Sequence, residues 1–486
     1  MKLFFLGLLI LVGGYFIYGR MIERALGPDD RDTPAKKFND GVDFVVLPHW
    51  KNMLIQLLNI AGVGPVIGVI LGIKFGVIAF VIIPIGNIIG GAVHDFLSGM
   101  MSLRSDGANL PRLIKENIGQ KFYYVFSVFM IFLLLLVVAV FINIPAQLID
   151  GMVPGKPVFW VAVAVIFIYY IAATLFPVDK IIGSLYPIFG GLLLLGSCAI
   201  FVAMLWKLRV APELLTESAA FQAKMFTAAK GQPLIPMLFV TIACGIMSGF
   251  HATQSPIIAR TMASEKNARA SFYGMMVLEG IIAMIWAGAA LMIYNLYPAL
   301  MSKAPGAVLS DITGHFLGKY AGGVTVISVI ILAVTSGDTA MRSLRLSLAE
   351  IINMPQGKIR ARILLCLPLI VIVSLLLWWS NKSASTFNQL WNYFAWGNQV
   401  LAASTLAAAT VWLGVRKINC WIAWLPGAFM TFVVTTYILW ISPAHGGPLG
   451  FGLELEHAYF YAGFTVILIT LALFDKIRKM NGESSH

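Results

Sequence analysis

The chain has 486 residues, of which 59% are hydrophobic and only 12% are charged, and its formal net charge is +12. Soluble domains carry about 25% charged residues, so this composition and the repeated apolar runs of about 20 residues indicate a polytopic α-helical membrane protein. The runs are continuous and do not alternate, which argues against an outer-membrane barrel. The positive charge is assigned to cytoplasmic loops, and no nucleic acid partner is expected.

The apolar segments predict an all-α polytopic membrane protein with about 13 transmembrane helices. The first, at residues 3–18, resembles a signal peptide but lacks a clear small-x-small cleavage site, so we interpret it as a retained helix. The others, numbered 1 to 12, are predicted at residues 53–71, 77–103, 122–148, 158–176, 182–206, 235–262, 270–294, 322–349, 363–379, 387–413, 418–441 and 458–474.

The connections between these helices differ in charge. If residues 20–51 are placed in the cytoplasm, most of the 34 Lys and Arg residues fall on that side. The positive-inside rule then predicts a multi-pass protein of the plasma (inner) membrane with a cytoplasmic C-terminus and an external N-terminus. Lys2 would lie outside, which weighs against a full crossing by the first helix.

The segment IAGVGPVIG (60–68) interrupts predicted helix 1. Gly62 and Gly64 weaken a helix, and Pro65 removes a backbone donor. Such a break is tolerated at membrane depth only where it is buried in protein or lines a watery cavity. We therefore expect Gly62, Gly64 and Pro65 to present backbone groups to a substrate or an ion. The alternative is that the glycines allow close helix packing.

The segment IACGIMSGFHATQSPIIARTMA (242–263) interrupts predicted helix 6, where Gly249 and Pro256 weaken a helix with an unusually polar centre. Freed N–H groups at a half-helix N-terminus favour a carboxylate, and His251 is a candidate donor or proton carrier. The residues predicted to bind substrate here are Ser248, Gly249, His251, Thr253 and Gln254. The alternative is a buried, neutral histidine that satisfies the loosened backbone.

The two breaks lie five predicted helices apart, and paired interruptions of this kind mark the binding site of an inverted repeat. We expect an N-terminal helix with a cytoplasmic loop (1–51), a first repeat of helices 1–5 (52–207), an external loop (208–234), a second repeat of helices 6–10 (235–413), and two C-terminal helices with a cytoplasmic tail (414–486). Residues 304–319 are too polar to span and predict a short external helix that caps the cavity.

Six motifs give the chain a family resemblance. They are IAGVGPVIG (60–68), GGAVHDFLSGMMSLRSDG (90–107), IACGIMSGFHA (242–252), ASEKNARASFYGMMVLEG (263–280), TSGDTAMRSLRL (335–346) and LWNYFAWGNQVLAA (390–403). In this order they resemble the carbon starvation protein A family over most of the sequence. That family is similar to the amino acid–polyamine–cation superfamily, which has the five-plus-five inverted repeat. The chain departs from familiar enterobacterial members in being shorter and in carrying Ile55-Gln56 where they have two histidines.

The resemblance implies uptake of short peptides or pyruvate during carbon starvation, with proton coupling for pyruvate. In superfamily members with a sodium site, hydroxyls of helix 8 and carbonyls of helix 1 hold the ion. Thr335 and Ser336 are the corresponding candidates, because hydroxyl oxygens suit a hard cation. Asp338 is the alternative, as a proton carrier. A third interpretation pairs Asp338 with Arg342 at i,i+4.

Further ionisable and polar residues lie inside predicted helices, where they are costly unless paired or functional. His94 and Asp95, about 100° apart on helix 2, are candidates for a proton relay, weak candidates for a metal site, or a structural hydrogen-bonded pair. Glu279 on helix 7 is either a coupling carboxylate or the partner of a base on another helix. Asn398 and Gln399 on helix 10 either face the cavity or bond neighbouring helices.

We therefore expect a secondary active symporter that works by alternating access. No HExxH, GxSxG, P-loop or complete GxGxxG motif is present, so an enzyme is not expected. A passive channel or nutrient sensor is the remaining class. We expect no cofactor beyond a coupling proton or, alternatively, sodium, and no partner beyond the lipid bilayer and a small-molecule substrate. The charged turn 264–269 is predicted to be cytoplasmic, where salt bridges with the Arg104 loop would make it a gate.

Overall fold

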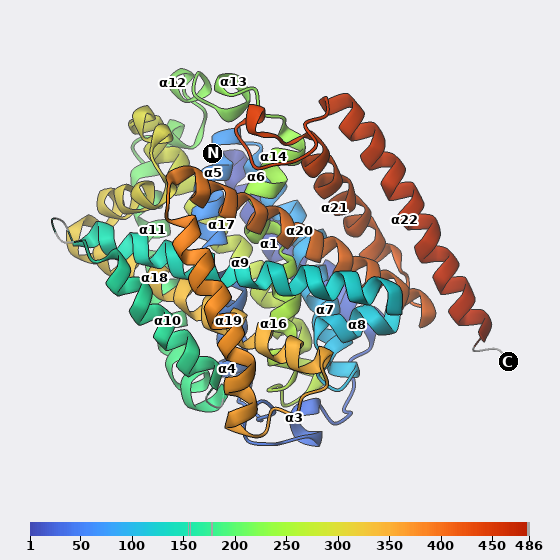
Figure 1. Cartoon of the computed structure of the whole chain (residues 1–486). Coiled ribbons are helices and arrows are strands. Elements are labelled where there is room, and N and C mark those ends of the chain that lie inside the picture. The colour runs from blue at the N-terminus through green and yellow to red at the C-terminus, as the bar shows by residue number, and fades with distance from the viewer. Residues whose placement is uncertain (154, 156, 176–177, 484–486) are drawn as a thin grey trace.

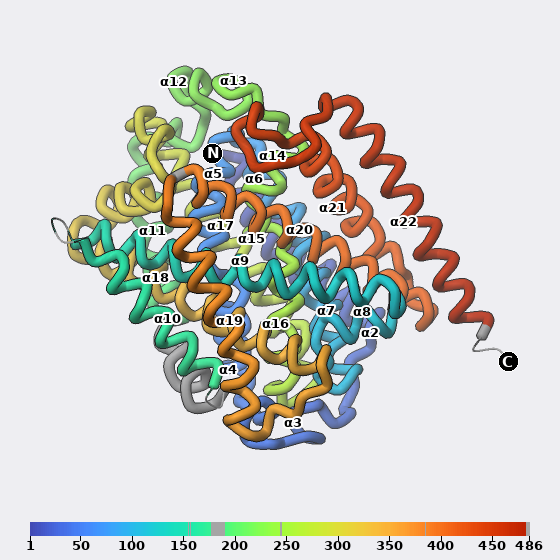
Figure 2. Tube along the Cα trace, viewed as in Figure 1, coloured from blue at the N-terminus to red at the C-terminus, as the bar shows by residue number. Residues whose placement is uncertain are grey.

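The computed structural model describes residues 1–153, 155, 157–175 and 178–483, which form a bundle of helices (Figure 1). No strand occurs among these residues, although Leu47 and Met262 form an isolated parallel bridge. The predicted all-α membrane fold is therefore confirmed. Figure 2 traces the chain from its N-terminus to α22 at one edge of the bundle.

The first part of the chain supplies the helices that correspond to the leading helix and to predicted helices 1–5. They are α1 (Lys2–Phe16), α2 (Tyr18–Leu26), α3 (Pro34–Lys37), α4 (His49–Ala61), η1 (Gly64–Gly68), α5 (Val69–Gly72), η2 (Ile73–Phe75), α6 (Ala79–Gly86), η3 (Asn87–Gly91), α7 (Ala92–Arg104), α8 (Leu110–Asn117), α9 (Gln120–Met152), α10 (Phe159–Leu175) and α11 (Val178–Leu208).

A connection with short helices leads to the second part of the chain. The connection contains η4 (Pro212–Leu215), α12 (Ala219–Gln222) and α13 (Phe226–Ala229). The second part contains α14 (Leu234–Thr241), α15 (Ala243–Ile246), α16 (Gly249–Ala259), η5 (Glu265–Asn267), η6 (Arg269–Gly274), α17 (Met275–Leu296), η7 (Pro298–Ser302), α18 (Pro305–Ile351), α19 (Ile359–Ser380), α20 (Ala384–Val415), α21 (Trp421–Trp440), η8 (Pro443–His445) and α22 (Leu455–Glu483).

Ten helices in the described part of the chain are long and apolar enough to cross a membrane, and the bent pair His49–Ala61 and Gly64–Phe75 makes eleven. Two predicted spans fall outside this number. Predicted helix 4 corresponds to the 17-residue α10, and its predicted end at residue 176 lies outside the described residues. Predicted helix 6 is divided among α14, α15 and α16. Both segments are helical: α10 is a single, shorter apolar helix, and only the helix 6 segment is divided.

The break in helix 1 lies where the sequence predicts it. α4 ends at Ala61 and is followed by Gly62, whose φ of 47° suits glycine. Gly64 and Pro65 begin the π-helical turn η1. The two halves of the helix bend by 51°. A Cβ on Gly62 would lie 3.0 Å from the ring of Phe141, so this glycine also lets the bend pack closely against α9.

The break in helix 6 lies earlier than Gly249 and Pro256 suggest. α15 is followed by two extended residues, Met247 with φ −169° and Ser248 with φ −134°. Gly249 then begins α16, and Pro256 lies inside that helix. The proline therefore does not make the break, because a membrane helix tolerates an internal proline when neighbouring groups satisfy the freed backbone.

Residues 304–319 form a helical piece of their own, although α18 is continuous from Pro305 to Ile351 in its hydrogen bonding. Gly318 interrupts the helix with φ 76° and ψ −180°. The two pieces fold against each other, because a Cβ on Gly322 would lie 2.8 Å from the carbonyl oxygen of Thr313. The predicted short helix before the long span is therefore present.

The broken helices lie inside the bundle. The 33-residue α9 crosses in front of them and packs along α18 (Figure 1). α4 and α16 pack against each other, and α4 also contacts α17. α21 and α22 pack together at one edge (Figure 1). This arrangement places both breaks away from the molecular surface.

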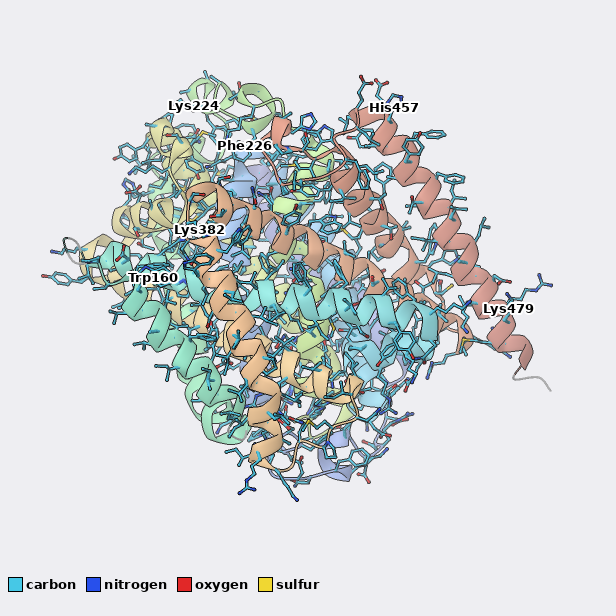
Figure 3. All side chains as sticks on the ribbon, viewed as in Figure 1. Trp160, Lys224, Phe226, Lys382, His457 and Lys479 are labelled. Carbon is cyan, nitrogen blue, oxygen red and sulfur yellow. The ribbon has the colours of Figure 1, made fainter. Side chains whose placement is uncertain are left out.

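The bundle has two recognisable ends. The N-terminus lies near α12 and α13, at what we call the α12 end, and α3 lies at the opposite end, the α3 end (Figure 1). Lys224 and Phe226 mark the α12 end in Figure 3. Lys479 lies near the last residue of α22, far from the α12 end. In this view the N-terminus lies at the α12 end, whereas the C-terminus lies beside the far end of α22.

Candidate functional site

Side chains of α20 hold the broken backbone of helix 6. Asn398 Nδ2 donates a hydrogen bond to Ser248 Oγ (2.7 Å), and Asn398 Oδ1 accepts one from the backbone N–H of Phe250 (2.6 Å). Gln399 Nε2 donates to the carbonyl of Met247 (2.9 Å). Buried backbone groups at a helix end need such partners. Asn398 and Gln399 therefore cap the break, and a carboxylate approaching the N-terminus of α16 must displace Asn398.

Gly249 lies directly against α20. A Cβ at this position would overlap the backbone nitrogen of Ala402, the side chain of Leu401 and the carbonyl oxygen of Asn398. The absence of a side chain therefore allows the close approach of α16 to α20. In this conformation Gly249 contacts protein, and it reaches a substrate only if the two helices separate.

Two carboxylates and two histidines from three helices meet beside the break. Asp95 Oδ1 lies 2.8 Å from His94 Nδ1, and Asp95 Oδ2 lies 3.0 Å from His251 Nδ1. His251 Nε2 lies 3.9 Å from Glu279 Oε2. All four side chains have no exposed surface. Predicted helices 2, 6 and 7 thus bring His94, Asp95, His251 and Glu279 into one group, which we call the acid–histidine cluster.

The contacts of Asp95 set the hydrogen positions in the acid–histidine cluster. An ionised carboxylate only accepts hydrogen bonds, so Nδ1 of both His94 and His251 carries hydrogen. In a neutral His251 the lone pair is then on Nε2, which faces Glu279. Neither carboxylate oxygen of Glu279 has a hydrogen-bond partner among the described residues. A proton placed between His251 Nε2 and Glu279 would therefore be shared by a base and an otherwise unsatisfied carboxylate.

The adjacent residues His94 and Asp95 on α7 make a contact that their helical spacing does not predict. His94 and Asp95 point in different directions along a helix, yet their side chains hydrogen-bond to each other. The structure supports this pairing and links it to α16 through His251. Among the described residues, no group of three or more His, Cys, Asp or Glu is arranged to hold a metal ion. His94 and Asp95 therefore gain no support as metal ligands.

The remaining polar residues of α16 bond within the protein. Thr253 Oγ1 donates to the carbonyl of Phe250 (2.7 Å), and Gln254 Nε2 donates to Thr253 Oγ1 (2.9 Å). Gln254 Oε1 has no hydrogen-bond partner in the described part of the chain. Ser255 Oγ lies 2.7 Å from Ser98 Oγ, and this hydrogen bond connects α16 to α7. Thr253 is thus used structurally, whereas Gln254 keeps a buried acceptor that a ligand or water would satisfy.

The candidate sodium residues on α18 lie next to the break of helix 1. Ser336 Oγ donates a hydrogen bond to the carbonyl of Leu58 (2.7 Å), which lies one turn before Gly62. Thr335 Oγ1 donates to the carbonyl of Leu332 in its own helix (2.9 Å). A hydroxyl of helix 8 and a carbonyl of helix 1 are therefore in contact, whereas Thr335 bonds the backbone of its own helix.

Asp338 contacts α10, since Tyr169 donates a hydrogen bond to Asp338 Oδ2 (2.5 Å). Arg342, one turn later, forms an ion pair with Asp43 at 3.1 Å and donates to the carbonyl of Ala173. Asp338 is thus tied to a tyrosine of another helix. Asp43 lies in the segment before helix 1, where no residue was predicted to be functional.

Three aromatic residues between the breaks were also missed by the sequence analysis. Phe141 of α9 lies 5.7 Å from Phe250 of α16 and 5.9 Å from Phe394 of α20, as ring centroids, and both pairs are edge-to-face. The rings fill the space beside Gly62 and the start of α16. Phenylalanines in apolar helices show no pattern that distinguishes a site from a core, and the position of Phe250 beside His251 was the available hint.

Gln56 and Asn59 on α4 form a second group that was missed. Both side chains are fully buried, and neither their amide nitrogens nor their carbonyl oxygens have a hydrogen-bond partner among the described residues. Leaving such groups unsatisfied costs about 1–3 kcal/mol each. Asn52 on the same helical face bonds Thr261 at the end of α16 (2.7 Å). The face of α4 toward α16 is therefore polar.

The charged turn 264–269 contacts the Arg104 loop. The side chain of Glu265 is 1% exposed. Its Oε1 lies 2.5 Å from Arg104 Nη2, and its Oε2 lies 3.3 Å from Arg31 Nε. Lys266 pairs with Asp30 at 2.6 Å, and Arg269 pairs with Glu23 at 2.7 Å. These ion pairs join the segment 23–31 to the loops after α7 and α16.

Comparison with known proteins places this arrangement in a family. The family model described as "Carbon starvation protein CstA" matches residues 1–181, 152–314 and 301–437. The chain belongs to the carbon starvation protein CstA family. An uncharacterized membrane protein of Haemophilus influenzae is 40% identical over 342 residues, which cover 60% of this chain and 91% of the relative.

The relatives that carry functional names include a peptide transporter and a pyruvate/proton symporter. A "Peptide transporter CstA" of Helicobacter pylori is 28% identical over 339 residues, which cover 56% of this chain and 48% of that protein. A "Pyruvate/proton symporter BtsT" of Escherichia coli is 28% identical over 345 residues, which cover 59% of this chain and 48% of that protein. The match thus extends over about half the length of these named transporters.

Solved structures show the fold of this CstA-family chain. A Na+-coupled sialic acid symporter superposes with a TM-score of 0.53 at 12% identity, covering 96% of this chain and 98% of that one. MhsT in complex with L-phenylalanine superposes with a TM-score of 0.55 at 12% identity, covering 88% of this chain and 99% of that one. A manganese transporter of Eremococcus coleocola gives 0.53 at 12% identity, covering 91% and 99%. At this identity the likeness establishes only that the chain shares the fold of these three proteins.

Proposed function

We propose that this chain is a secondary active transporter for short peptides or pyruvate-like carboxylates, and that the acid–histidine cluster carries a coupling proton. The observation that carries the proposal is the meeting of Asp95, His251 and Glu279, without exposed surface, beside the break of helix 6. Intramembrane ionisable groups gathered in this way are typical of proton relays. The names of the relatives from Helicobacter pylori and Escherichia coli support the same substrate classes.

A proton changes the electrostatics of the closed interior. With neutral histidines, ionised Asp95 and Glu279 give the acid–histidine cluster two negative charges and no positive charge. A proton on His251 or Glu279 removes one net negative charge, and the cost of burying charge falls. The closed conformation therefore favours the protonated cluster, and hydration after opening favours release. Proton binding is in this way linked to alternating access.

The substrate carboxylate is assigned to the N-terminus of α16. There the backbone N–H of Phe250 and the amide of Asn398 supply donors, once Asn398 Oδ1 gives up its bond to Phe250. Gln254 adds an unsatisfied acceptor for a donor on the substrate. The backbone around Gly62, Gly64 and Pro65 completes the site from helix 1.

A sodium ion is the second candidate for the coupling ion. It is favoured by the contact between Ser336 Oγ and the carbonyl of Leu58, because such oxygens bind hard cations. Opening that hydrogen bond would present both oxygens to the ion, and the nearby Thr335 would have to turn its hydroxyl. In this alternative the acid–histidine cluster is a structural connection between α7, α16 and α17.

The α3 end is assigned to the cytoplasm of the cell that carries the protein in its inner membrane. The basic segment 20–51 lies at this end, and the positive-inside rule places such segments in the cytoplasm. In this orientation the C-terminus is cytoplasmic and the N-terminus is external. The described conformation is then closed toward the cytoplasm by the ion pairs around Glu265.

Uptake into proteoliposomes tests the proposal. The purified chain is reconstituted, and labelled pyruvate and a labelled dipeptide are supplied under an inward proton gradient and then under an inward sodium gradient. Accumulation of one substrate that a protonophore abolishes supports proton coupling. Accumulation that follows sodium moves the coupling site to Ser336. Equilibration without accumulation under either gradient contradicts a secondary active transporter of these substrates.

A further inference from the structure

The segment 38–48 is folded by its own side chains and docks on the end of α16. Asp40 Oδ1 accepts hydrogen bonds from the backbone N–H groups of Val42, Asp43 and Phe44 at 2.8 to 2.9 Å. Two backbone bonds then join the segment to α16, from Val45 to the carbonyl of Arg260 and from Leu47 to that of Thr261. The turn therefore holds Asp43 in a defined position.

Asp43 points into a basic pocket on α18. Its Oδ1 lies 3.1 Å from Arg342 Nη1 and 3.4 Å from Arg345 Nη2. The three side chains are 7%, 1% and 0% exposed. Arg345 also donates to Gln356 Oε1 (2.6 Å), while its Nε has no hydrogen-bond partner among the described residues. The two guanidinium groups thus share one carboxylate oxygen and leave a buried donor unused.

The charges around Asp43 keep it ionised. Burial acts to raise the pKa of Asp43, but Arg345, Arg342 and Arg260 outweigh burial and hold that pKa below its usual range. Removing Asp43 would leave Arg342 and Arg345 buried with less negative charge nearby, which is strongly unfavourable for buried ions. If the segment 38–48 withdraws, the two arginines therefore favour the binding of another anion.

We propose that Arg342 and Arg345 form a carboxylate-binding site that Asp43 fills in this conformation and that the carboxylate of a transported molecule fills when the segment 38–48 leaves. Arginine is well suited to bind a carboxylate, because its planar guanidinium group is always charged and offers several hydrogen-bond donors. Displacement of Asp43 by the arriving carboxylate would then release the segment. The transport role rests on the proposed function, whereas the anion site itself does not.

The position of the site along α18 fits an exit from the breaks. Arg342 and Arg345 lie six and nine residues beyond Ser336, which is about 9 and 14 Å along a helix. Ser336 contacts helix 1 just before Gly62. Ser343, which lies between the two arginines in α18, donates a hydrogen bond to the carbonyl of Thr253 (2.8 Å). This part of α18 therefore lies alongside α16. A molecule leaving the breaks toward the α3 end would thus meet the two arginines.

Acetate binding to the purified full-length chain tests the site without transport. In Asp43→Asn the site loses its internal anion, so sodium acetate should raise the melting temperature in a saturable manner, beyond sodium chloride at equal concentration and beyond acetamide. In the natural chain the apparent affinity should be at least about tenfold weaker, because Asp43 occupies the site for most of the time. Adding Arg345→Gln to Asp43→Asn should abolish the effect.

Asp106→Asn is the matched control. Asp106 forms an exposed ion pair with Lys37 of the neighbouring segment (3.2 Å), and its φ of 54° suits asparagine. This variant loses the same charge but leaves the arginine pocket filled, so it should respond to acetate as the natural chain does. An acetate response equal in Asp106→Asn and Asp43→Asn, or a folded Asp43→Asn that responds to acetate and chloride alike, would overturn the proposal.

Limited proteolysis of the natural chain keeps the test decisive if Asp43→Asn does not fold. Acetate and pyruvate should accelerate tryptic cleavage after the exposed Lys36 and Lys37, because displacement of Asp43 frees the segment, and Arg345→Gln should remove the acceleration. Cleavage that does not respond to carboxylates contradicts the site. Failure of proteoliposome uptake with a positive acetate result would contradict the proposed function and leave the anion site in place.

Discussion

Asp95 occupies a central position among the buried ionisable side chains. It is bonded to histidines on both sides, and it orients the ring of His251 so that Nε2 faces Glu279. The carboxylate of Glu279 has no hydrogen-bond partner in the described part of the chain. Asp95 therefore acts through the orientation of His251, and Glu279 is the group whose protonation changes the charge of the interior most directly.

Replacing Glu279 by glutamine should separate transport from its coupling. The amide keeps the size of the side chain but cannot exchange a proton, so the coupling free energy between proton and substrate is lost. We expect accumulation in proteoliposomes to fall to a ratio of about 1 at zero membrane potential, while exchange of labelled for unlabelled substrate continues.

Glu116→Gln, which removes an exposed i,i+4 ion pair with Arg112 on α8, serves as the control and should accumulate substrate normally. Accumulation driven by the proton gradient in Glu279→Gln would show that this carboxylate does not carry the proton.

The charge of Asp43 should stay constant over the working pH range. Since its pKa is held below the usual range by the arginines despite burial, its contribution to stability is present above the unfolded pKa of about 3.9 and is lost only as the pH falls through the lower folded value. Asp43→Asn should therefore change the rate of uptake without moving the midpoint of its pH profile between pH 5 and 8. A midpoint displaced by about one pH unit would contradict this assignment.

At the scale of the elements, the two breaks were predicted with different success. In helix 1, Gly62 adopts a positive φ, so glycine at that position carried direct information on the bend. In helix 6, the extended residues are Met247 and Ser248, whose types show no such preference, and the partners that stabilise them lie on α20. Long-range capping of this kind is not visible in the local sequence.

The same reasoning applies to the candidate site. His94, Asp95, His251 and Glu279 were each identified because ionisable residues are rare within apolar helices. Their contact depends on the packing of α7, α16 and α17 and was not predicted. Asp43 was missed because an aspartate in a polar loop is ordinary. Its role depends on Arg342 and Arg345, which lie 299 and 302 positions later in the chain.

Gly249→Ala tests the close approach of α16 and α20. The added methyl group would overlap the backbone of Ala402 and Asn398, and overpacking of this kind costs typically about 1–3 kcal/mol. We expect a lower melting temperature in detergent and reduced uptake. Gly463→Ala on α22, where a Cβ would meet nothing within 4 Å, should leave the melting temperature unchanged or slightly higher, since alanine favours a helix. Equal stability of the two variants would contradict the tight contact.

At the scale of the whole molecule, the ion pairs of the α3 end hold three separated segments together. Glu265 contacts both Arg104 and Arg31, so it joins the loops after α7 and α16 to the segment before helix 1. Because Glu265 is 1% exposed, this contact is screened by solvent less than a surface pair. The α3 end is therefore expected to open as a unit.

Glu265→Gln should make that opening easier. A loss of one or two kcal/mol corresponds to a change of about 5–30-fold in an equilibrium, and amide hydrogen exchange of residues 45–47 and 260–262 should accelerate by that order. Asp29→Asn, which removes an exposed ion pair with Arg31 (side chains 48% and 49% exposed), should change exchange little because surface pairs contribute little. Unchanged exchange in Glu265→Gln would show that the backbone bonds of the segment 38–48 suffice for closure.

The length of α9 links the molecule to the thickness of its membrane. Its 33 residues extend about 50 Å, whereas the hydrocarbon core of a bilayer measures about 30 Å, so the helix must lie obliquely if its apolar length is to remain in lipid. α9 packs along α18 and carries Phe141 against helix 1. A thinner bilayer would tilt α9 further and would shift the ring of Phe141 relative to the bend of helix 1. The length of the lipid acyl chains would in this way affect the transport cycle.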